Sequence, residues 1–329
     1  PEALDSLKIG DYIQLENGKM KIEVISKEED GVTCTIINGG VLKSRKSLFV
    51  PGVKLDIPYI SEIDREDIKY ACRNNGDYLA ISFVSFKEEV LQVKEILKEE
   101  KSDIKIICKI ESKAGVENLD EILEVCDGIM VARGDLGEEV PVALLPVYQK
   151  EMLESMIKNP RPTRAEVTDV ANAVLDGTDA IMLSGESTIG AYPVEAVSYM
   201  ASISEDTEKY SEKNFEYKGK IGRTESIAAC AVDLNKYVEV KAIACASVSG
   251  FTARFISNFR PKAPIMATCT SEKVARSLAL NYGVYTSIVP VRNDTDEMVR
   301  LASLKTKEFF DLKKKDKIII TGGIPITDK

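Results

Sequence analysis

Short apolar runs that alternate with helical stretches constrain the fold of this chain more than any other feature. The first three runs start about 25 residues apart, the length of one βα unit. This alternation over residues 53–208 predicts an α/β fold, either a (β/α)8 barrel or a doubly wound sheet. The expected strands are Asp77–Ser82, Ile104–Ile110, Asp127–Ala132 and Asp179–Ser184, and the expected helices are Glu62–Asn74, Phe86–Glu100 and Val116–Val125.

The segments on either side of this region have different patterns. Residues 1–52 contain alternating runs separated by turn sequences, including Glu16–Lys19, and they predict a small β module such as a lid or an inserted domain. Residues 209–223 are polar and contain two glycines, which is typical of a linker. Residues 224–329 alternate strands and helices again, with helices expected at Phe251–Asn258 and Ser271–Leu280 among others, and predict a second domain with a doubly wound sheet.

The βα repetition fails between Asp127 and Asp179, where there is room for another strand but no strand pattern. Four barrel-like strands are expected, whereas a closed barrel needs eight, and half a barrel cannot bury the edges of its sheet. We therefore expect that internal segments are missing from this chain, with one break near 151/152. Ordinary Cα–Cα distances of about 3.8 Å across residues 150–153 would contradict this expectation.

The composition excludes several classes of protein. The net charge of -9 argues against a nucleic-acid partner, and no basic stripe offsets it. The longest apolar runs have the length of strands, so we expect no membrane span. Seven scattered cysteines without a Cys-x-x-Cys motif are typical of reduced thiols, and we expect a cytoplasmic protein.

The chain contains no histidine, which restricts its chemistry. Ser-His-Asp catalysis, Cys-His catalysis and His-ligated zinc are excluded. A bound metal must be held by oxygen atoms, which favours Mg²⁺ or Mn²⁺. A proton donor must be a lysine, a tyrosine, a carboxyl group or water.

Charged residues follow the second and third expected strands. Lys109 and Glu111 are two residues apart, so on a strand they face the same way, and Asp135 lies in a Gly-Asp-Leu-Gly turn. Parallel α/β folds build their sites at strand ends, where two carboxylates suit a divalent metal and a lysine suits an anionic substrate. The spacing alone fits a surface ion pair and an ordinary turn equally well.

Four stretches resemble the pyruvate kinase family, in one order and without gaps. Lys105–Val116 resembles its catalytic-lysine signature, and Asp127–Gly137 resembles its metal and substrate loop; Met152–Glu166 and Asp169–Glu186 match further family sequences. The resemblance implies a (β/α)8 barrel with an inserted small β-barrel lid domain and a C-terminal doubly wound α/β domain. Residues 1–52 would be the later part of the lid, 53–208 the later part of the barrel, 209–223 a linker and 224–329 an effector-binding domain.

The resemblance implies transfer of phosphate from phosphoenolpyruvate to ADP, giving pyruvate and ATP. Lys109 would contact the transferring phosphoryl group, and a water held by Ser184 and Glu186 would protonate the enolate. Glu111 and Asp135 would hold Mg²⁺ (or Mn²⁺). The remaining roles would be substrate binding by the amides of Ala132, Arg133 and Gly134, nucleotide binding by Lys46, and binding of a sugar-phosphate or nucleotide effector by Ser247, Ser249, Gly250 and Thr252.

The resemblance also implies a homotetramer and a need for K⁺, but the family stretches that supply the K⁺ ligands are absent here. The catalytic arginine in Asn-Phe-Ser-His-Gly has no match, and no Ala-Thr-Gln strand precedes Met152. An alternative interpretation of Lys46 is a solvated surface lysine without a role in binding. An alternative interpretation of Ser249 or Thr252 is an ordinary helix N-cap.

Two other functions remain open. One is a metal-dependent pyruvate-enolate aldolase or lyase on the same kind of barrel, and the other is a non-catalytic metabolite-binding regulator. The aldolase interpretation leaves Lys46, the β module and the C-terminal domain unexplained. A coupled assay for ATP formation from phosphoenolpyruvate distinguishes the three functions.

Overall fold

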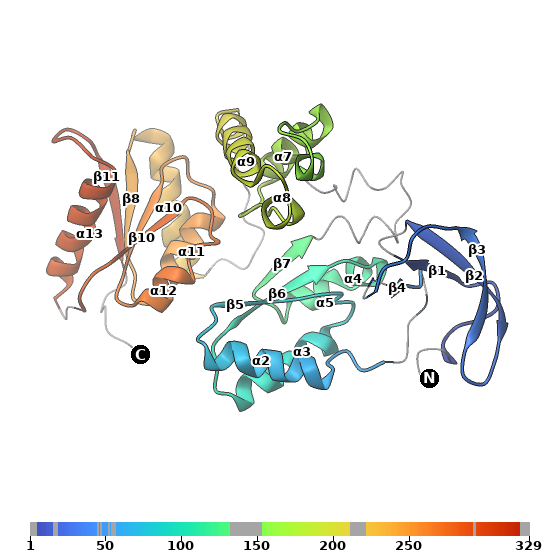
Figure 1. Cartoon of the computed structure of the whole chain (residues 1–329). Helices are drawn as coiled ribbons and strands as arrows, with labels where there is room; N and C mark the ends of the chain where they lie inside the picture. Colours follow the sequence, from blue (N-terminus) through green and yellow to red (C-terminus); the bar gives the residue numbers. More distant parts are fainter. Residues whose placement is uncertain are drawn as a thin grey trace. The chain divides into compact units, whose positions relative to one another are not determined.

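A computed structural model gives the fold of residues 5–15, 19–44, 46, 48–51, 53, 57–131, 153–210, 222–291 and 294–322 (Figure 1). The chain separates into two compact units, Pro1–Glu151 and Met152–Lys329, which are described one at a time. The break expected near 151/152 falls outside the described residues. Among the described helices, none is both long enough and apolar enough to cross a membrane.

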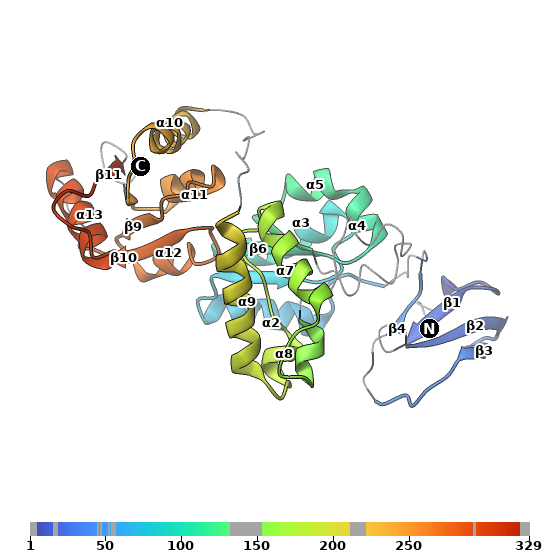
Figure 2. The same ribbon diagram turned by 90° about the horizontal axis from the view of Figure 1, so that it is seen from above.

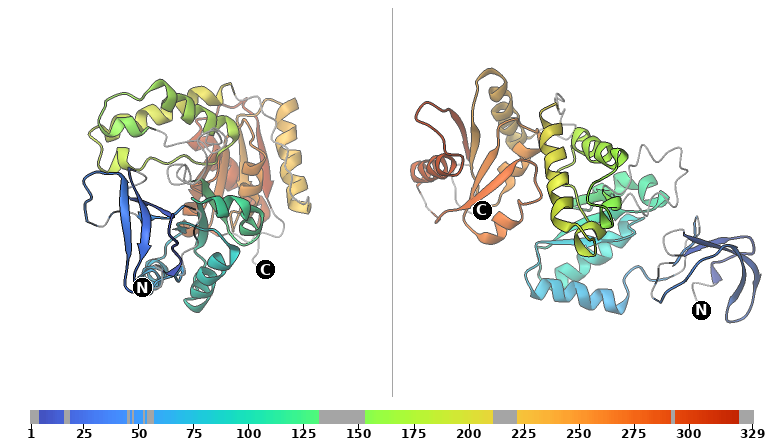
Figure 3. Two further views of the ribbon diagram at one scale, coloured as in Figure 1. Left: turned by 90° about the vertical axis from the view of Figure 1, so that its right-hand side faces the viewer. Right: turned by 45° about the horizontal axis from the view of Figure 1, so that its top comes forward.

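The N-terminal β module, drawn in dark blue in Figure 3, is an antiparallel sheet. Its strand order is β3-β2-β1-β4. Its strands are β1 (Tyr12–Leu15), β2 (Met20–Lys27), β3 (Val32–Asn38) and β4 (Leu48–Phe49). Ile13 and Val24 alternate with solvent-facing residues and pack with Leu7 and Val50 in a small core. The alternation in the sequence therefore gives the expected strands, and the turn expected at Glu16–Lys19 lies largely outside the described residues.

Three parallel strands with flanking helices follow the β module, in the order β5-β6-β7. Buried Ile106, Cys108 and Ile110 alternate along β6 with Lys105 and Lys109, so one face of the strand is apolar and the other carries charge. The expected strands are confirmed. The elements are α2 (Glu62–Arg73), β5 (Tyr78–Ile81), α3 (Lys87–Glu99), β6 (Lys105–Ile110), α4 (Lys113–Glu117), α5 (Leu119–Leu123) and β7 (Gly128–Val131).

The helix expected at Val116–Val125 is wrong in one respect, because the structure has two short helices there, α4 and α5. Asn118 lies between them as the C-cap of the first, and its side-chain amide donates to the carbonyls of Ala114 and Ser85. An asparagine side chain that bonds to nearby backbone competes with a continuous helix, which explains the break.

The second unit begins with helices that pack on each other (Figure 2). They are η2 (Glu154–Ile157), α7 (Arg164–Asp176), α8 (Gly185–Thr188) and α9 (Pro193–Glu208). Met156, Val170 and Met200 contribute to their shared core. The strand expected at Asp179–Ser184 is wrong, because these residues are described and form no strand. A β-strand needs a hydrogen-bonded neighbour, and none of the described strands pairs with this segment.

The C-terminal domain is a parallel sheet with the order β10-β9-β8-β11 and helices on both faces (Figure 1). Ile243 and Cys245 pack with α10 and α11, whereas Ala244 and Ala246 pack with Ala302 of α13. Strands buried on both faces are typical of doubly wound sheets, as the sequence predicts. The elements are α10 (Arg223–Tyr237), β8 (Ala242–Ala246), α11 (Phe251–Asn258), β9 (Ile265–Cys269), α12 (Glu272–Arg276), β10 (Val284–Ile288), α13 (Thr295–Phe309) and β11 (Ile318–Gly322).

Candidate active site

An ion pair with a buried carboxylate lies at the carboxyl end of β6. The ammonium of Lys109 is 2.6 Å from Oε1 of Glu111, and the side chain of Glu111 is only 1% exposed. The two residues share a face of the strand, as their spacing predicts. Lys109 also donates a hydrogen bond of 3.0 Å to Oγ of Ser82, at the end of the neighbouring strand β5. A cation and a carboxylate therefore meet where two parallel strands end.

The turn after β5 fixes the carboxylate. The amide of Phe83 donates to Oε2 of Glu111 at 2.6 Å. Phe83 has a φ of 54°, a left-handed conformation that costs free energy in a residue with a side chain. Strain of this kind is found at sites where a backbone group must point at a specific atom.

Tyr59 supports the same turn from the side. Its hydroxyl donates to the carbonyl of Ser82 at 2.8 Å. Burial raises the pKa of Tyr59, and the nearby charge of Glu89 raises it further, so the hydroxyl keeps its proton. The sequence analysis did not identify Tyr59, Ser82 or Phe83. Ser82 could have been found, since it ends an expected strand beside the strand of Lys109.

Asp135, the second expected carboxylate, lies outside the described residues. So do the expected substrate-binding residues Ala132, Arg133 and Gly134. Among the described side chains, no group of three His, Cys, Asp or Glu residues could hold a metal ion. Oε1 of Glu111 is nevertheless buried and accepts no hydrogen bond from the described residues, although the ammonium of Lys109 lies against it. An anionic oxygen in this state suits a cation as an additional partner.

Ser184 and Glu186 are brought together in the second unit. The amide of Ser184 donates to Oε2 of Glu186 at 2.9 Å. Glu186 lies on the short helix α8 and is 5% exposed, whereas Ser184 is exposed. Gly190 follows closely, and a Cβ there would lie 2.2 Å from the carbonyl oxygen of Glu186, so only glycine fits. Lys46, the expected nucleotide ligand, is an exposed residue of the first unit.

The loop after β8 and the first turn of α11 contain the four expected effector residues. Ser247 is buried and its amide donates to the carbonyl of Thr268, whereas Ser249 is exposed. Gly250 is the N-cap of α11 with a φ of 77°, and no described side chain caps this helix. The plain N-cap interpretation of Ser249 or Thr252 is therefore wrong. The loop follows the strand at which the order of the sheet reverses, the usual ligand position in doubly wound folds.

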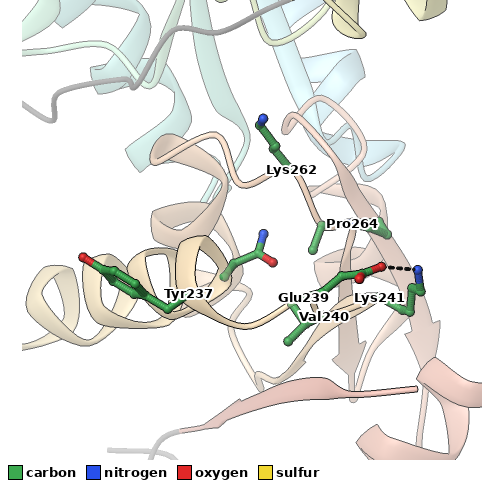
Figure 4. Close-up of a pocket in the computed structure, with 8 residues that line it drawn as sticks. Tyr237, Glu239, Val240, Lys241, Lys262 and Pro264 are labelled. Atoms are coloured by element: carbon green, nitrogen blue, oxygen red, sulfur yellow. Dashed lines mark hydrogen bonds and ion pairs between the residues drawn. The ribbon is translucent and has the colours of Figure 1, made fainter. Parts of the chain in front are cut away.

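A surface hollow of about 390 Å³ lies elsewhere in the C-terminal domain, beside the amino ends of β8 and β9 (Figure 4). Lys241 there pairs with Glu239 at 2.7 Å. None of the predicted site residues lines this hollow, which is bordered by Asn235, Tyr237, Glu239, Val240, Lys241, Lys262, Ala263 and Pro264.

The parallel βα sheet with a Lys-Glu pair at its strand ends, together with a doubly wound domain, defines a multidomain α/β protein of the barrel-enzyme type. The sequence model of the pyruvate kinase barrel domain matches residues 1–197, and that of the pyruvate kinase alpha/beta domain matches residues 225–329. The chain therefore belongs to the pyruvate kinase family. These matches confirm the predicted family and the predicted fold class.

Individual proteins that are similar to this chain are also pyruvate kinases. A pyruvate kinase from Geobacillus stearothermophilus is 42% identical over 99% of this chain and 60% of its own length. One from Clostridium acetobutylicum is 40% identical over 97% of this chain and 72% of its own length. A crystal structure of a pyruvate kinase from Cryptosporidium parvum superposes with a TM-score of 0.88 at 34% identity, covering 98% of this chain and 72% of that one.

The chain spans about 60% of the length of several of these relatives. The alignment with the Geobacillus protein has 355 positions, whereas this chain has 329 residues. Some positions of that relative therefore have no counterpart here. The domain boundaries and the break near 151/152 stay predictions.

Proposed function

We propose that the complete protein is a phosphotransferase that transfers phosphate from phosphoenolpyruvate to ADP and releases pyruvate and ATP. The observation that carries this proposal is the Lys109-Glu111 ion pair, whose carboxylate is buried at a strand end within a stretch that resembles the family's catalytic signature. Phosphoryl transfer depends on charge neutralisation and positioning more than on covalent chemistry. A fixed ammonium at a strand end is suited to that task.

Lys109 would contact the phosphoryl group and stabilise the negative charge that develops on its oxygens. Its contacts with Glu111 and Ser82 hold the ammonium in place, so little reorganisation is needed when substrate binds. ADP would bind near Lys46. The amides of Ala132, Arg133 and Gly134 would face the carboxylate of phosphoenolpyruvate, since turn amides bind anions.

Glu111 and Asp135 would hold Mg²⁺ or Mn²⁺. The buried Oε1 of Glu111, which accepts no hydrogen bond from the described residues although the Lys109 ammonium lies against it, supports this assignment. When bound, the metal would neutralise the carboxylate and the enolate oxygen of the substrate. K⁺ is expected as a second cation through the family resemblance.

Ser184 and Glu186 would hold the water that protonates the enolate. The hydrogen bond between the Ser184 amide and Glu186 supports a shared role, because it aims a buried carboxylate at an exposed serine. A chain without histidine needs such a water or another side chain as its proton donor.

The loop of Ser247, Ser249, Gly250 and Thr252 would bind a sugar-phosphate or nucleotide that activates the enzyme. The uncapped amides of the first turn of α11 support this proposal, because such amides favour phosphate. Changing Ser249 and Thr252 together to Ala should abolish activation, whereas unchanged activation would reject the site. We also expect a cytoplasmic homotetramer.

The complete protein should be assayed for ATP formation from phosphoenolpyruvate and ADP with Mg²⁺ and K⁺. ATP formation that requires both substrates supports the proposal. Consumption of a pyruvate-containing substrate without ATP would indicate an aldolase or lyase. Binding of phosphorylated metabolites without turnover would indicate a regulator.

A further inference from the structure

Arg260 lies two residues after the end of α11, next to its C-cap Phe259, and is hydrogen-bonded to the last turn of this helix. It has a φ of 50°, in the left-handed region, and its amide donates to the carbonyl of Ser257 at 2.9 Å. An arginine seldom adopts this conformation, which needs support from its surroundings. The direction of the side chain is therefore tied to α11.

The guanidinium of Arg260 binds three consecutive residues from an earlier part of the chain. It donates to the carbonyl oxygen of Gly177, to that of Thr178 at 3.4 Å and to Oδ1 of Asp179 at 2.8 Å. The side chain of Arg260 is only 11% exposed, whereas that of Asp179 is 53% exposed, so the arginine end of this connection between α11 and the turn after α7 is largely shielded from solvent.

The turn is built to present these acceptors. Gly177 is the C-cap of α7 with a φ of 88°, a conformation that favours glycine. The amides of Gly177 and Thr178 donate back to the carbonyls of Val174 and Ala173 in the last turn of α7. Their N-H groups are used within the helix end, while their carbonyl oxygens are available to Arg260.

An aromatic ring also contacts the guanidinium of Arg260. Cζ of Arg260 lies 4.3 Å from the centre of the Tyr282 ring, within the range of a cation-π contact. Ser257 of α11 donates to the carbonyl of Tyr282 at 2.7 Å. The ring and the arginine are thus both anchored to the same helix.

We infer that Arg260 is a positioning residue that couples α11 to the segment carrying Ser184 and Glu186. The loop at one end of α11 is the proposed effector site, and Arg260 at the other end holds the turn five residues before Ser184. A helix of eight residues spans about 12 Å as a rigid element, so it can transmit a displacement between its ends. This inference rests on the proposed function for its regulatory meaning.

The variant Arg260→Lys tests the coupling. Lysine keeps the positive charge but cannot bond to three acceptors with a planar fork. The matched control is Lys262→Ala, which lies two residues further on. Lys262 is exposed at the surface hollow and makes no ion pair with the described residues (Figure 4).

The measurement is the phosphoenolpyruvate concentration at half-saturation in the complete protein, with and without fructose 1,6-bisphosphate, ribose 5-phosphate or AMP as probe. We expect an active probe to lower it about fivefold or more in the parent protein and in Lys262→Ala. In Arg260→Lys the probe should bind with unchanged affinity by calorimetry but shift half-saturation less than twofold. A purely structural arginine would leave this shift intact, and a full shift would overturn the inference.

If no probe changes the phosphoenolpyruvate concentration at half-saturation in the parent protein, the proposed effector site is rejected. Hydrogen exchange then tests the positioning role of Arg260 independently of any effector. Amides of Thr178–Ser184 should then exchange at least tenfold faster in Arg260→Lys than in Lys262→Ala. Equal exchange in the two variants would overturn the positioning role.

Discussion

The amide of Phe83 donates a hydrogen bond of 2.6 Å to Oε2 of Glu111, although the two residues belong to different strand ends. Ser82, the preceding residue, accepts a hydrogen bond from the ammonium of Lys109. One turn therefore holds both members of the ion pair. The strained backbone of Phe83 has a reason in this geometry, because it lets a single turn serve a cation and an anion.

Lys109→Met should lower kcat by about 10²- to 10³-fold, because it removes the ammonium that we propose stabilises the transferring phosphoryl group. Lys105→Met is the control from the same strand, where the lysine pairs with Asp127 at 3.5 Å. Loss of that partly exposed pair should change kcat less than twofold. Steady-state kinetics of both variants, with circular dichroism to confirm folding, check this prediction. A Lys109→Met enzyme within tenfold of the parent would refute the assignment.

Glu111→Gln should raise the Mg²⁺ concentration needed for half-maximal activity by about tenfold or more, because it removes the anionic group that we propose as a metal ligand while keeping the side-chain volume. The amide oxygen of glutamine can still accept from Phe83, so the turn should keep its shape. Glu117→Gln is the control, since Glu117 forms an exposed ion pair with Lys113 on α4. An unchanged Mg²⁺ titration would show that Glu111 is not a metal ligand.

Ser82→Ala should lower kcat about tenfold, which corresponds to ~1.4 kcal/mol, near the lower limit for a hydrogen bond to a charged group. The ammonium of Lys109 would keep its ion pair with Glu111 but lose one anchor. Ser102→Ala provides a control, because the hydroxyl of Ser102 accepts from the Ile104 amide in the loop before β6, away from Lys109 on the strand. Equal kcat values for the two variants would indicate that Ser82 does not position Lys109.

The sequence predicts the ion pair because the geometry of a strand has a period of two, so Lys109 and Glu111 must share a face. It does not predict Ser82 and Phe83 as partners, because that contact depends on how β5 and β6 align. The register places Tyr78 beside Lys105 and Ile81 beside Cys108, which brings the turn after β5 next to Lys109 and Glu111. Register of this kind is set by the whole sheet.

Two other elements show where sequence patterns reach their limit. Asp179–Ser184 has a strand pattern, but no described strand lies beside it to complete the hydrogen bonds. The pattern of Ser271–Leu280 predicts a longer helix than α12. In contrast, Phe251–Asn258 forms α11 with the predicted bounds, because Gly250 before it adopts the left-handed conformation that starts the helix sharply.

Glu166 links two helices and provides a pH-dependent contribution to stability. Its carboxylate accepts from the amide and hydroxyl of Ser155 in η2 and from those of Thr163, the N-cap of α7. Burial opposes ionisation most strongly, but the hydrogen bonds from Ser155 and Thr163 together outweigh it and lower the pKa of Glu166 below 4.5. A folded-state pKa below that of the unfolded chain stabilises the fold only while the carboxylate is ionised.

Glu166→Gln should therefore cost about 1 kcal/mol of unfolding free energy at pH 7, as expected for loss of a helix cap. The difference from the parent should be complete above pH 4.5 and shrink as the pH falls through the folded-state pKa. Urea unfolding at pH 7, 5 and 3.5 measures it, with Glu195→Gln on the exposed side of α9 as control. A destabilisation that is equal at all three pH values would contradict an ionised Glu166 and would leave only a packing contribution.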